Sequence, residues 1–125
     1  MSDQRKTAAD LLAELEKIDD AQITPVDVPE WGMRLWLRII PAGDGVEMQD
    51  AMAGLDAQAV GREMTFVMLA LALCAEDGSR LFSSVAEGRA FLAKRQGRVL
   101  LRLYEAAARL NGAWKDAQET EPGKA

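Results

Sequence analysis

Residues 64–75 read Met-Thr-Phe-Val-Met-Leu-Ala-Leu-Ala-Leu-Cys-Ala, and they form the most apolar stretch of the chain. A helix that is apolar on every side lies in the middle of a globular protein, with other elements packed around it. The stretch has 12 residues, whereas a helix that crosses a bilayer needs roughly 20. It therefore predicts a central core helix, with helical spacing from Ala57 onward, and no membrane partner.

Length and composition support one ordinary globular domain around this helix. The chain has 125 residues, of which 49% are hydrophobic and 28% are charged, so it has the balance of a folded protein with a single core. Fifteen basic residues stand against 20 acidic ones, which gives a net charge of −5. This sign is wrong for a protein that gains affinity by neutralising phosphates, and we expect no nucleic-acid partner.

The redox and targeting signals indicate the cytoplasm. Cys74 is the single cysteine, so no internal disulfide can form and nothing indicates an oxidising compartment. Residues 1–10 are polar and mixed in charge, unlike the basic start and apolar centre of a signal peptide.

Two short strands joined by a turn are predicted before the core helix, at residues 22–28 and 33–40, with the turn at 29–32. Pro25 and Pro29 cannot donate ladder hydrogen bonds, which makes the first strand an edge or an irregular one. Side chains alternate across a strand. One face of the second strand therefore holds Met33, Leu35, Leu37 and Ile39, and the other holds Arg34, Trp36, Arg38 and Ile40.

Start and stop signals predict three further helices, one between the second strand and the core helix and two after the core helix. Asp44 as cap with Glu47 starts a short helix through about Met52, and Gly54 ends it. After a turn at Asp77 and Gly78, Ser84 with Glu87 opens a helix that Gly88 and Gly97 weaken or interrupt. That helix is expected to bury Val85, Phe91 and Leu92. The last helix covers about residues 98–110, carries a stripe of Leu100, Leu103, Ala107 and Leu110, and stops at Asn111 and Gly112.

The N-terminal residues 7–18 also have helical spacing, with Thr7 and Asp10 as a start signal. The apolar positions form one stripe, made of Leu11, Leu12, Leu15 and Ile18. An isolated helix of about 12 residues is marginal in water, so these side chains need a surface to pack on. That surface is the protein's own core, a second copy, or a partner.

No constellation for catalysis is visible in the sequence. The chain has no histidine, which removes Ser-His-Asp and Cys-His nucleophilic sites. The acidic pairs at 19–20 and 76–77 have the character of solvated turns and lack calcium-loop spacing, and no phosphate-binding glycine loop is present. We therefore expect no enzymatic activity, no metal and no cofactor. Cys74 is predicted to be a buried structural thiol, because its leucine and alanine neighbours hide it.

The most suggestive binding residues lie on the second strand. Arg34, Trp36 and Arg38 share one face, and arginine and tryptophan dominate binding hot spots. The alternative is a tryptophan buried under a helix with two arginines shielding it. Trp31 is predicted to anchor the turn on the core, and Trp114 to make a tail contact. The methionines at 48, 52, 64 and 68 fill the core or form an adaptable groove.

Four segments in order resemble one known family. They are Val26-Asp-Val-Pro-Glu-Trp-Gly32, the strand through Arg38, the apolar helix running into Cys74-Ala-Glu-Asp-Gly-Ser-Arg-Leu-Phe82, and Ala106-Ala-Ala-Arg-Leu-Asn-Gly112. Together these segments, over about residues 22–112, resemble the tail assembly chaperones of long-tailed (siphovirus-like) bacteriophages and prophages. The resemblance implies an α+β fold, mostly α, in which an N-terminal β-hairpin packs against a bundle of about four to five helices.

The resemblance also implies a function. Members of that family bind the tape measure protein, keep it soluble and assist assembly of tail tube protein around it, in the host cytoplasm, and are absent from the finished virion. Many also make a longer product by ribosomal frameshifting, which here would extend the chain after about Gly112. The alternative is a head-tail completion protein or minor tail structural protein. We expect self-association, and we expect the partner surface to include Arg34, Trp36, Arg38, Leu11, Leu15 and Ile18.

These expectations divide the chain into three parts. Residues 1–20 are an N-terminal amphipathic helix, residues 21–112 are a single globular domain, and residues 113–125 are a polar C-terminal tail.

Overall fold

The computed structural model describes residues 5–112. In this part of the chain five α-helices and three strands form an α+β fold that is mostly helical, which confirms the predicted class. Trp114 and the predicted polar tail at 113–125 lie outside the described residues. The elements in order are α1 (Ala8–Leu15), β1 (Ile23–Val28), the 3-10 turn η1 (Pro29–Trp31), β2 (Met33–Arg38), α2 (Ala42–Met52), α3 (Ala57–Ala72), β3 (Leu73–Cys74), α4 (Val85–Leu92) and α5 (Gly97–Leu110).

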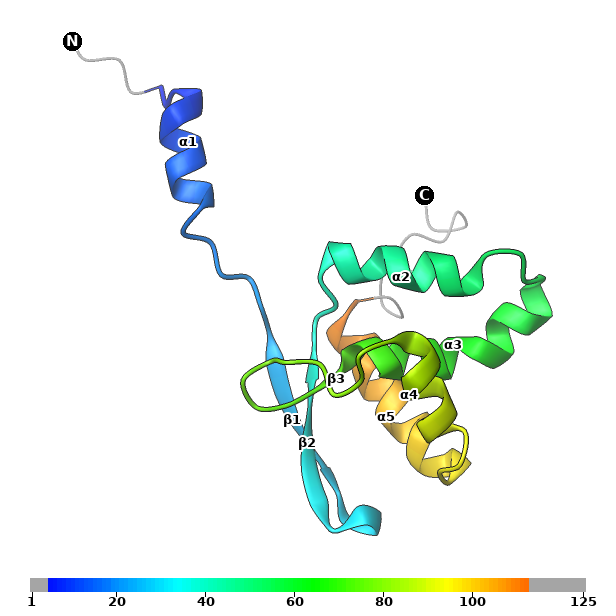
Figure 1. The fold of residues 1–125 in the computed structure, drawn as a ribbon. Coiled ribbons are helices and arrows are strands. Elements are labelled where there is room, and N and C mark those ends of the chain that lie inside the picture. The colour runs from blue at the N-terminus through cyan, green and yellow to red at the C-terminus, as the bar shows by residue number, and fades with distance from the viewer. Residues whose placement is uncertain (1–4, 113–125) are drawn as a thin grey trace, which may run out of the picture.

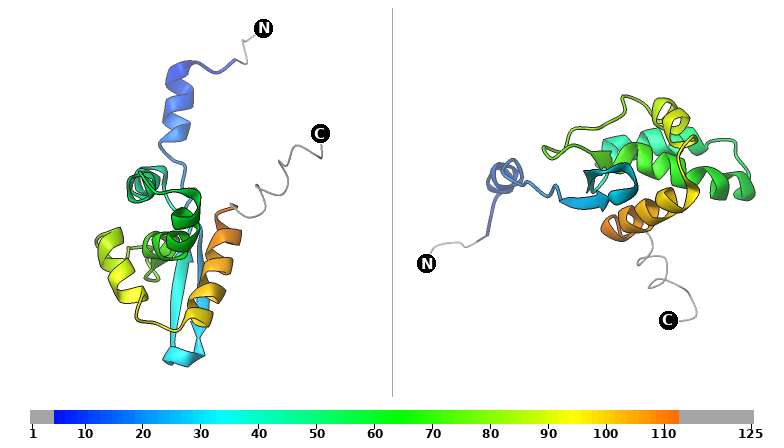
Figure 2. Two further views of the ribbon diagram at one scale, coloured as in Figure 1. Left: turned by 90° about the vertical axis from the view of Figure 1, so that its right-hand side faces the viewer. Right: turned by 90° about the horizontal axis from the view of Figure 1, so that it is seen from below.

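The body of the molecule consists of the small sheet and helices α2 to α5, whereas α1 stands clear of it (Figures 1 and 2). Helix α3 is the centre: it packs against α2, α4 and α5, and its residues from Val67 to Ala72 are all buried. This confirms the core helix predicted from residues 64–75 in position, though not in length. The helix ends at Ala72, and Leu73 and Cys74 continue as a strand that pairs with Leu37 and Trp36 of β2.

The early end of α3 has no signal in the apolar pattern, because a continuous apolar run fits a buried helix and a buried strand equally well. Leu73 takes extended backbone angles (φ −68°, ψ 131°). The turn predicted at Asp77 and Gly78 is present, with a positive φ of 89° at Gly78.

Strands β1 and β2 form the predicted hairpin, in antiparallel register with Val26 opposite Leu35. Leu35 and Leu37 are buried, as expected for the inner face, and Trp31 packs against the core from the turn. Met33 was expected on the buried face but is 50% exposed, because it is the first residue of β2 and directly follows the turn. The second strand also ends at Arg38 rather than at Ile40.

Strand β1 is the predicted edge strand, since the sheet order is β1-β2-β3. The Ile39 N–H donates to the carbonyl of Gln22, which lies directly opposite. Hydrogen-bonded pairs alternate along an antiparallel ladder, so the backbone groups of Ile23 and Pro25 face the free edge. Pro25 has no N–H, and the row of donors on that edge is interrupted there.

Helix α4 packs closely on α3, and Gly88 makes the close approach possible. A Cβ at Gly88 would lie 2.6 Å from the Cβ of Ala70. The sequence suggested that Gly88 weakens or interrupts this helix. In the structure the helix continues through Gly88, which is buried at the contact with α3. Ser84 caps α4 as expected, accepting from the Glu87 N–H at 3.1 Å. Phe91, expected in the core, is 44% exposed and packs against Phe82 on the outside.

Helix α5 closes the other side of α3. Leu100, Leu103 and Ala107 of its predicted stripe are buried, and Leu110 is half-buried. The helix ends at Leu110, with Asn111 as its C-terminal cap. The positive φ of 75° at Gly112 confirms the predicted stop. The Asn111 side chain also joins two elements. Its Oδ1 accepts from the Ile40 N–H at 2.7 Å, and its Nδ2 donates to the Arg38 carbonyl at 3.2 Å.

Candidate protein-interaction surfaces

Helix α1 exposes its whole apolar stripe. The helix begins with a complete capping box: the Thr7 hydroxyl accepts from the Asp10 N–H, and the Asp10 carboxylate accepts from the Thr7 N–H, both at 3.1 Å. It spans Ala8–Leu15 rather than 7–18, so Ile18 lies just beyond it. No residue of α1 is buried. The side chains of the stripe, Leu11, Leu12, Leu15 and Ile18, are between 47% and 60% exposed.

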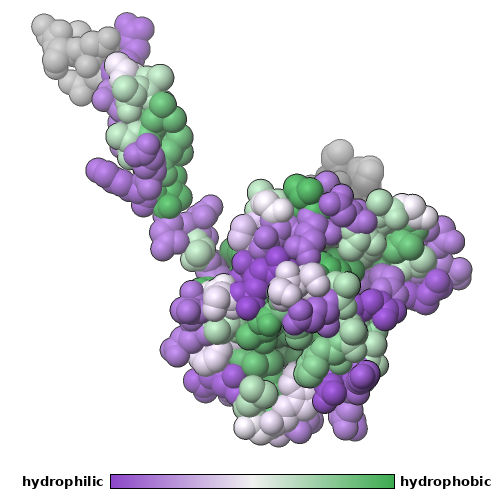
Figure 3. Space-filling model, in the orientation of Figure 1, coloured by the Kyte–Doolittle hydropathy of each residue, from purple (hydrophilic) through white to green (hydrophobic). Residues whose placement is uncertain are grey.

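This stripe runs along the length of α1 in the space-filling view (Figure 3). Single exposed leucines are ordinary, but three on one helix that has no buried residue, with Ile18 just beyond it, mark a contact surface. We call residues 5–22, which contain α1 and its link to β1, the arm.

The three candidate residues on β2 have different environments. Arg34 is exposed and pairs with Asp27 across the hairpin at 2.7 Å. Trp36 is half-buried. The Arg38 side chain is 11% exposed, and its guanidinium donates to the Leu71 carbonyl at 2.9 Å and to Asp44 at 2.5 Å. The structure thus does not bring the three into one exposed cluster, and the Arg38 guanidinium is occupied within the fold.

Asp44 and Glu47 were expected to cap α2, but both turn toward arginines instead. The helix starts at Ala42, where the fixed φ of Pro41 precedes it without a side-chain cap. Glu47 pairs with Arg80 at 2.9 Å and accepts from the Val85 N–H at 2.8 Å, so it holds the start of α4. Arg80 and this N–H together lower the pKa of Glu47. No local pattern predicts this, since Glu47 and Arg80 lie 33 residues apart.

Two further ion pairs tie the elements together. Arg102 of α5 forms a bidentate pair with Glu30 of the turn, at 2.7 and 2.8 Å. Hydrogen bonding to Arg102 lowers the pKa of Glu30 to about 2. Arg89 of α4 pairs with Glu63 of α3 in the same way, at 2.5 and 2.8 Å.

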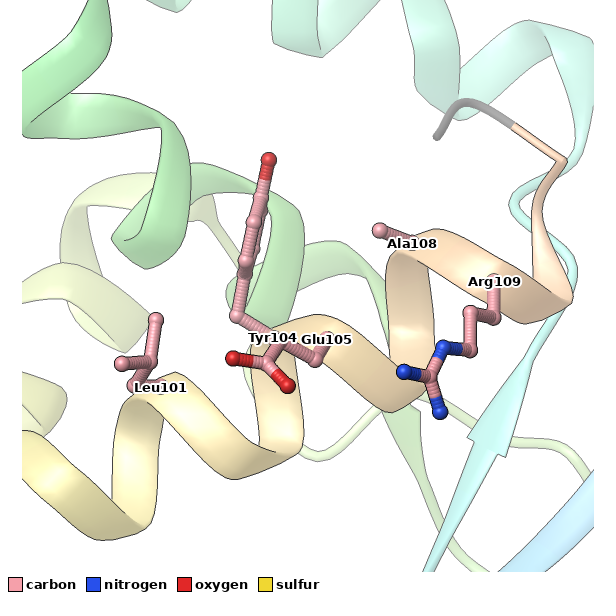
Figure 4. Close-up of a pocket in the computed structure, with 5 residues that line it drawn as sticks. All are labelled: Leu101, Tyr104, Glu105, Ala108 and Arg109. Carbon is pink, nitrogen blue, oxygen red and sulfur yellow. The ribbon is translucent and has the colours of Figure 1, made fainter. Parts of the chain in front are cut away.

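Helix α5 lines a hollow of about 380 Å³, which we call the α5 hollow; in its lining Ala108 is buried and Tyr104 is half-buried. The side chains of Leu101, Tyr104 and Ala108 point to one side of the helix, with Glu105 and Arg109 beside them (Figure 4). Leu101 is 54% exposed. A second hollow, of about 270 Å³, lies at the base of the arm and is lined by Asp20, Ala21, Ile39, Ile40, Pro41 and Ala42.

The remaining candidates belong to the core. Cys74 is fully buried, and burial raises the pKa of its thiol. Met68 is buried, and Met48 and Met52 pack against the core, which favours the core-filling role for these three methionines; Met64 is half-buried. Among residues 5–112 no group of three or more Cys, Asp or Glu side chains is placed to hold a metal ion. No helix in this part of the chain is long and apolar enough to cross a membrane.

Comparison with known proteins gives one informative match. No protein-family model matches the sequence, and no curated protein sequence is similar to it. Among solved structures, the chain is similar to the tail assembly chaperone of bacteriophage HK97, with a TM-score of 0.55 and 23% sequence identity. The similarity covers 82% of this chain and 94% of that one. The resemblance inferred from the sequence is therefore confirmed at the level of the fold: this chain has the fold of the bacteriophage HK97 tail assembly chaperone.

Proposed function

We propose that this protein is a tail assembly chaperone of a long-tailed bacteriophage or prophage, which binds the tape measure protein in the host cytoplasm and keeps it soluble. The observation that carries the proposal is the fold shared with the HK97 chaperone over 94% of that chain. In this role the protein assists assembly of the tail tube and does not remain in the virion.

The exposed surfaces support a holding function. A long amphipathic client offers apolar side chains at helical spacing, and a helix with an exposed apolar stripe can pack against such a segment. The arm presents a stripe of this kind on a preformed helix. The net charge of −5 keeps a complex with exposed apolar surface in solution.

Co-expression tests this proposal directly. The tape measure protein encoded in the same genome is produced with and without this chain, and its soluble fraction is measured. The wild-type chain should raise that fraction, and the Leu11→Glu/Leu15→Glu variant should raise it less. Leu81→Glu, at another exposed leucine, is the matched control and should act like the wild type. A client that stays insoluble with the wild-type chain contradicts the proposal.

Mass spectrometry of purified virions separates the chaperone from the alternative. A chaperone is absent from finished particles, whereas a head-tail completion or minor tail protein persists in them. Stoichiometric recovery of this chain from virions would therefore replace the proposal with the structural one.

Part of the client surface is proposed to lie on the hairpin, at Arg34 and Trp36, with Arg38 behind them. Trp36→Ala should weaken client binding by about 2 kcal/mol or more if the ring is a hot spot. A variant that unfolds while its folded fraction binds normally would instead make Trp36 a residue of the fold.

Self-association is also part of the proposal, with the arm as the shared element. Removing residues 1–20 should lower the assembly size in light scattering and leave the body folded, because no described residue of this segment is buried. A full-length chain that stays monomeric at all concentrations contradicts it.

A further inference from the structure

The arm and the α5 hollow are two exposed apolar surfaces of the described chain, one a ridge and the other a depression. The arm offers a ridge of leucine side chains, and the hollow offers a depression lined by Leu101, Tyr104 and Ala108. Within one copy they do not meet, since no residue of α1 is buried. Figure 2 shows α1 projecting away from the helices of the body.

Their charges are complementary as well. Residues 5–20 carry five acidic and three basic side chains, whereas residues 97–110 carry three basic side chains, of which Arg102 is paired with Glu30, and one acidic side chain. Glu16 and Glu14, which pairs with Lys6, border the leucine stripe, and Arg98 and Arg109 lie on the exposed side of α5. Two copies of net charge −5 repel each other overall, so an attractive contact needs a local match of this kind.

The hollow at the base of the arm does not offer this match. Asp20 lines it, and Asp19 lies beside Asp20 in the sequence. An acidic helix placed there would meet like charges, which are unfavourable across an interface. Charge therefore distinguishes the two hollows as acceptors for the arm.

We propose that the α5 hollow of one copy receives the leucine stripe of α1 from a second copy. The inference rests on the self-association included in the proposed function, and it names the acceptor surface. Because donor and acceptor differ, the contact is head-to-tail, and each pair keeps one free arm and one free hollow.

Complementation between two full-length variants tests this arrangement. Leu11→Glu/Leu15→Glu disables the donor, and Leu101→Glu/Arg109→Glu disables the acceptor; all four positions are exposed. In size-exclusion chromatography with light scattering, each variant alone should lose association at least tenfold. Their mixture should form one-to-one pairs, because one variant supplies an intact arm and the other an intact hollow. Circular dichroism verifies that each variant is folded, and Leu81→Glu should associate like the wild type.

A second measurement uses Leu15→Cys in one copy and Leu101→Cys in another. Oxidation of the mixture should give a disulfide-linked heterodimer in good yield, and Leu15→Cys with Leu81→Cys should not. Cys74 is fully buried and does not compete. Raising the salt concentration should weaken association of the wild type, since part of the attraction is between exposed charges.

The outcomes separate this inference from the proposed function. A mixture that stays monomeric while the wild type associates overturns the α5 hollow as acceptor and leaves self-association standing. Equal cross-linking at Leu101→Cys and Leu81→Cys also overturns it. A wild type that never associates removes both self-association and this contact, and solubilisation of the tape measure protein is still decided by co-expression.

Discussion

Helices α1 and α5 have the same kind of leucine stripe, yet α5 buries its stripe against α3 and α1 exposes its own. Both begin and end where local signals place them within a few residues. The difference arises from what surrounds them: α5 returns to the core through a short turn after α4, whereas α1 is separated from β1 by an exposed link. An apolar stripe predicts that a surface needs burial, and the rest of the chain decides whether the burial occurs within one molecule.

The largest expected effect contrasts equivalent truncations on the two helices. Leu103→Ala removes a fully buried side chain from α5 and should lower the free energy of unfolding by about 2–5 kcal/mol. Leu15→Ala on α1 should change it by less than about 0.5 kcal/mol. Urea denaturation at low protein concentration measures both. A large loss for Leu15→Ala would mean that α1 docks on its own body in solution.

Glycine substitutions sharpen the same contrast between close-packed and open helix faces. Gly88→Ala places a methyl group against Ala70 and should destabilise the protein by about 1–3 kcal/mol. Gly61→Ala, in α3 with open space around it, is the matched control and should stabilise by about 0.5–1 kcal/mol. Thermal unfolding monitored by circular dichroism measures whether each substitution lowers or raises the stability. Equal effects would contradict the close contact between α3 and α4.

Polar anchors should show a smaller difference between body and arm. Asn111→Ala leaves the Ile40 N–H without its partner and should cost about 1–3 kcal/mol of unfolding free energy. Thr7→Ala removes the cap of α1, which is worth roughly 1 kcal/mol to the helix. Because α1 is not part of the body, Thr7→Ala should leave the global unfolding transition unchanged. It should reduce only the helical circular dichroism signal that is measured before that transition. A shifted global transition for Thr7→Ala would show that the arm and body unfold together.

The smallest effect concerns pH and the pair between Glu30 and Arg102, which links the body's turn to α5. The pKa of Glu30 falls from 4.5 to about 2 on folding. A lowered pKa stabilises the fold above pH 4.5, and this contribution is lost as the pH falls from about 4.5 toward 2. Glu30 is exposed to solvent screening, so the effect is modest. Urea titrations should show a steeper acid loss for the wild type than for Glu30→Gln. Arg102→Gln should reduce the slope equally, and an unchanged slope would contradict the pair.

Local signals predicted the helices and the hairpin of this fold but not β3, because caps, turns and periodicity act over a few residues. Thr7, Ser84 and Gly112 all mark real helix ends. The order of such segments also indicated the fold, which the comparison with a solved structure confirms. The sequence could not place Asp44 and Glu47, since their arginine partners come from distant parts of the chain. It also could not predict that the core helix ends before Leu73, because an apolar run does not indicate that the next residues pair with β2.

For the candidate surface, sequence patterns found the amphipathic helix but not the separation of Arg34 from Arg38. Alternation places both on one strand face, and only the neighbouring α2 and α3 decide that Asp44 and the Leu71 carbonyl engage one of them. The α5 hollow was missed because the predicted stripe on that helix marked only its buried side. Leu101 and Tyr104 lie between the stripe residues, and these two apolar positions are the sequence feature that indicates a second apolar surface on the helix.

The interrupted edge of β1 has a consequence for backbone pairing with extended segments of other chains. A continuous free edge binds extended segments through main-chain hydrogen bonds, which do not themselves distinguish one sequence from another. Pro25 breaks that edge in the middle. Backbone pairing along β1 is then disfavoured. If the protein acts as proposed, recognition of its client depends on side chains, whose spacing differs from one chain to another.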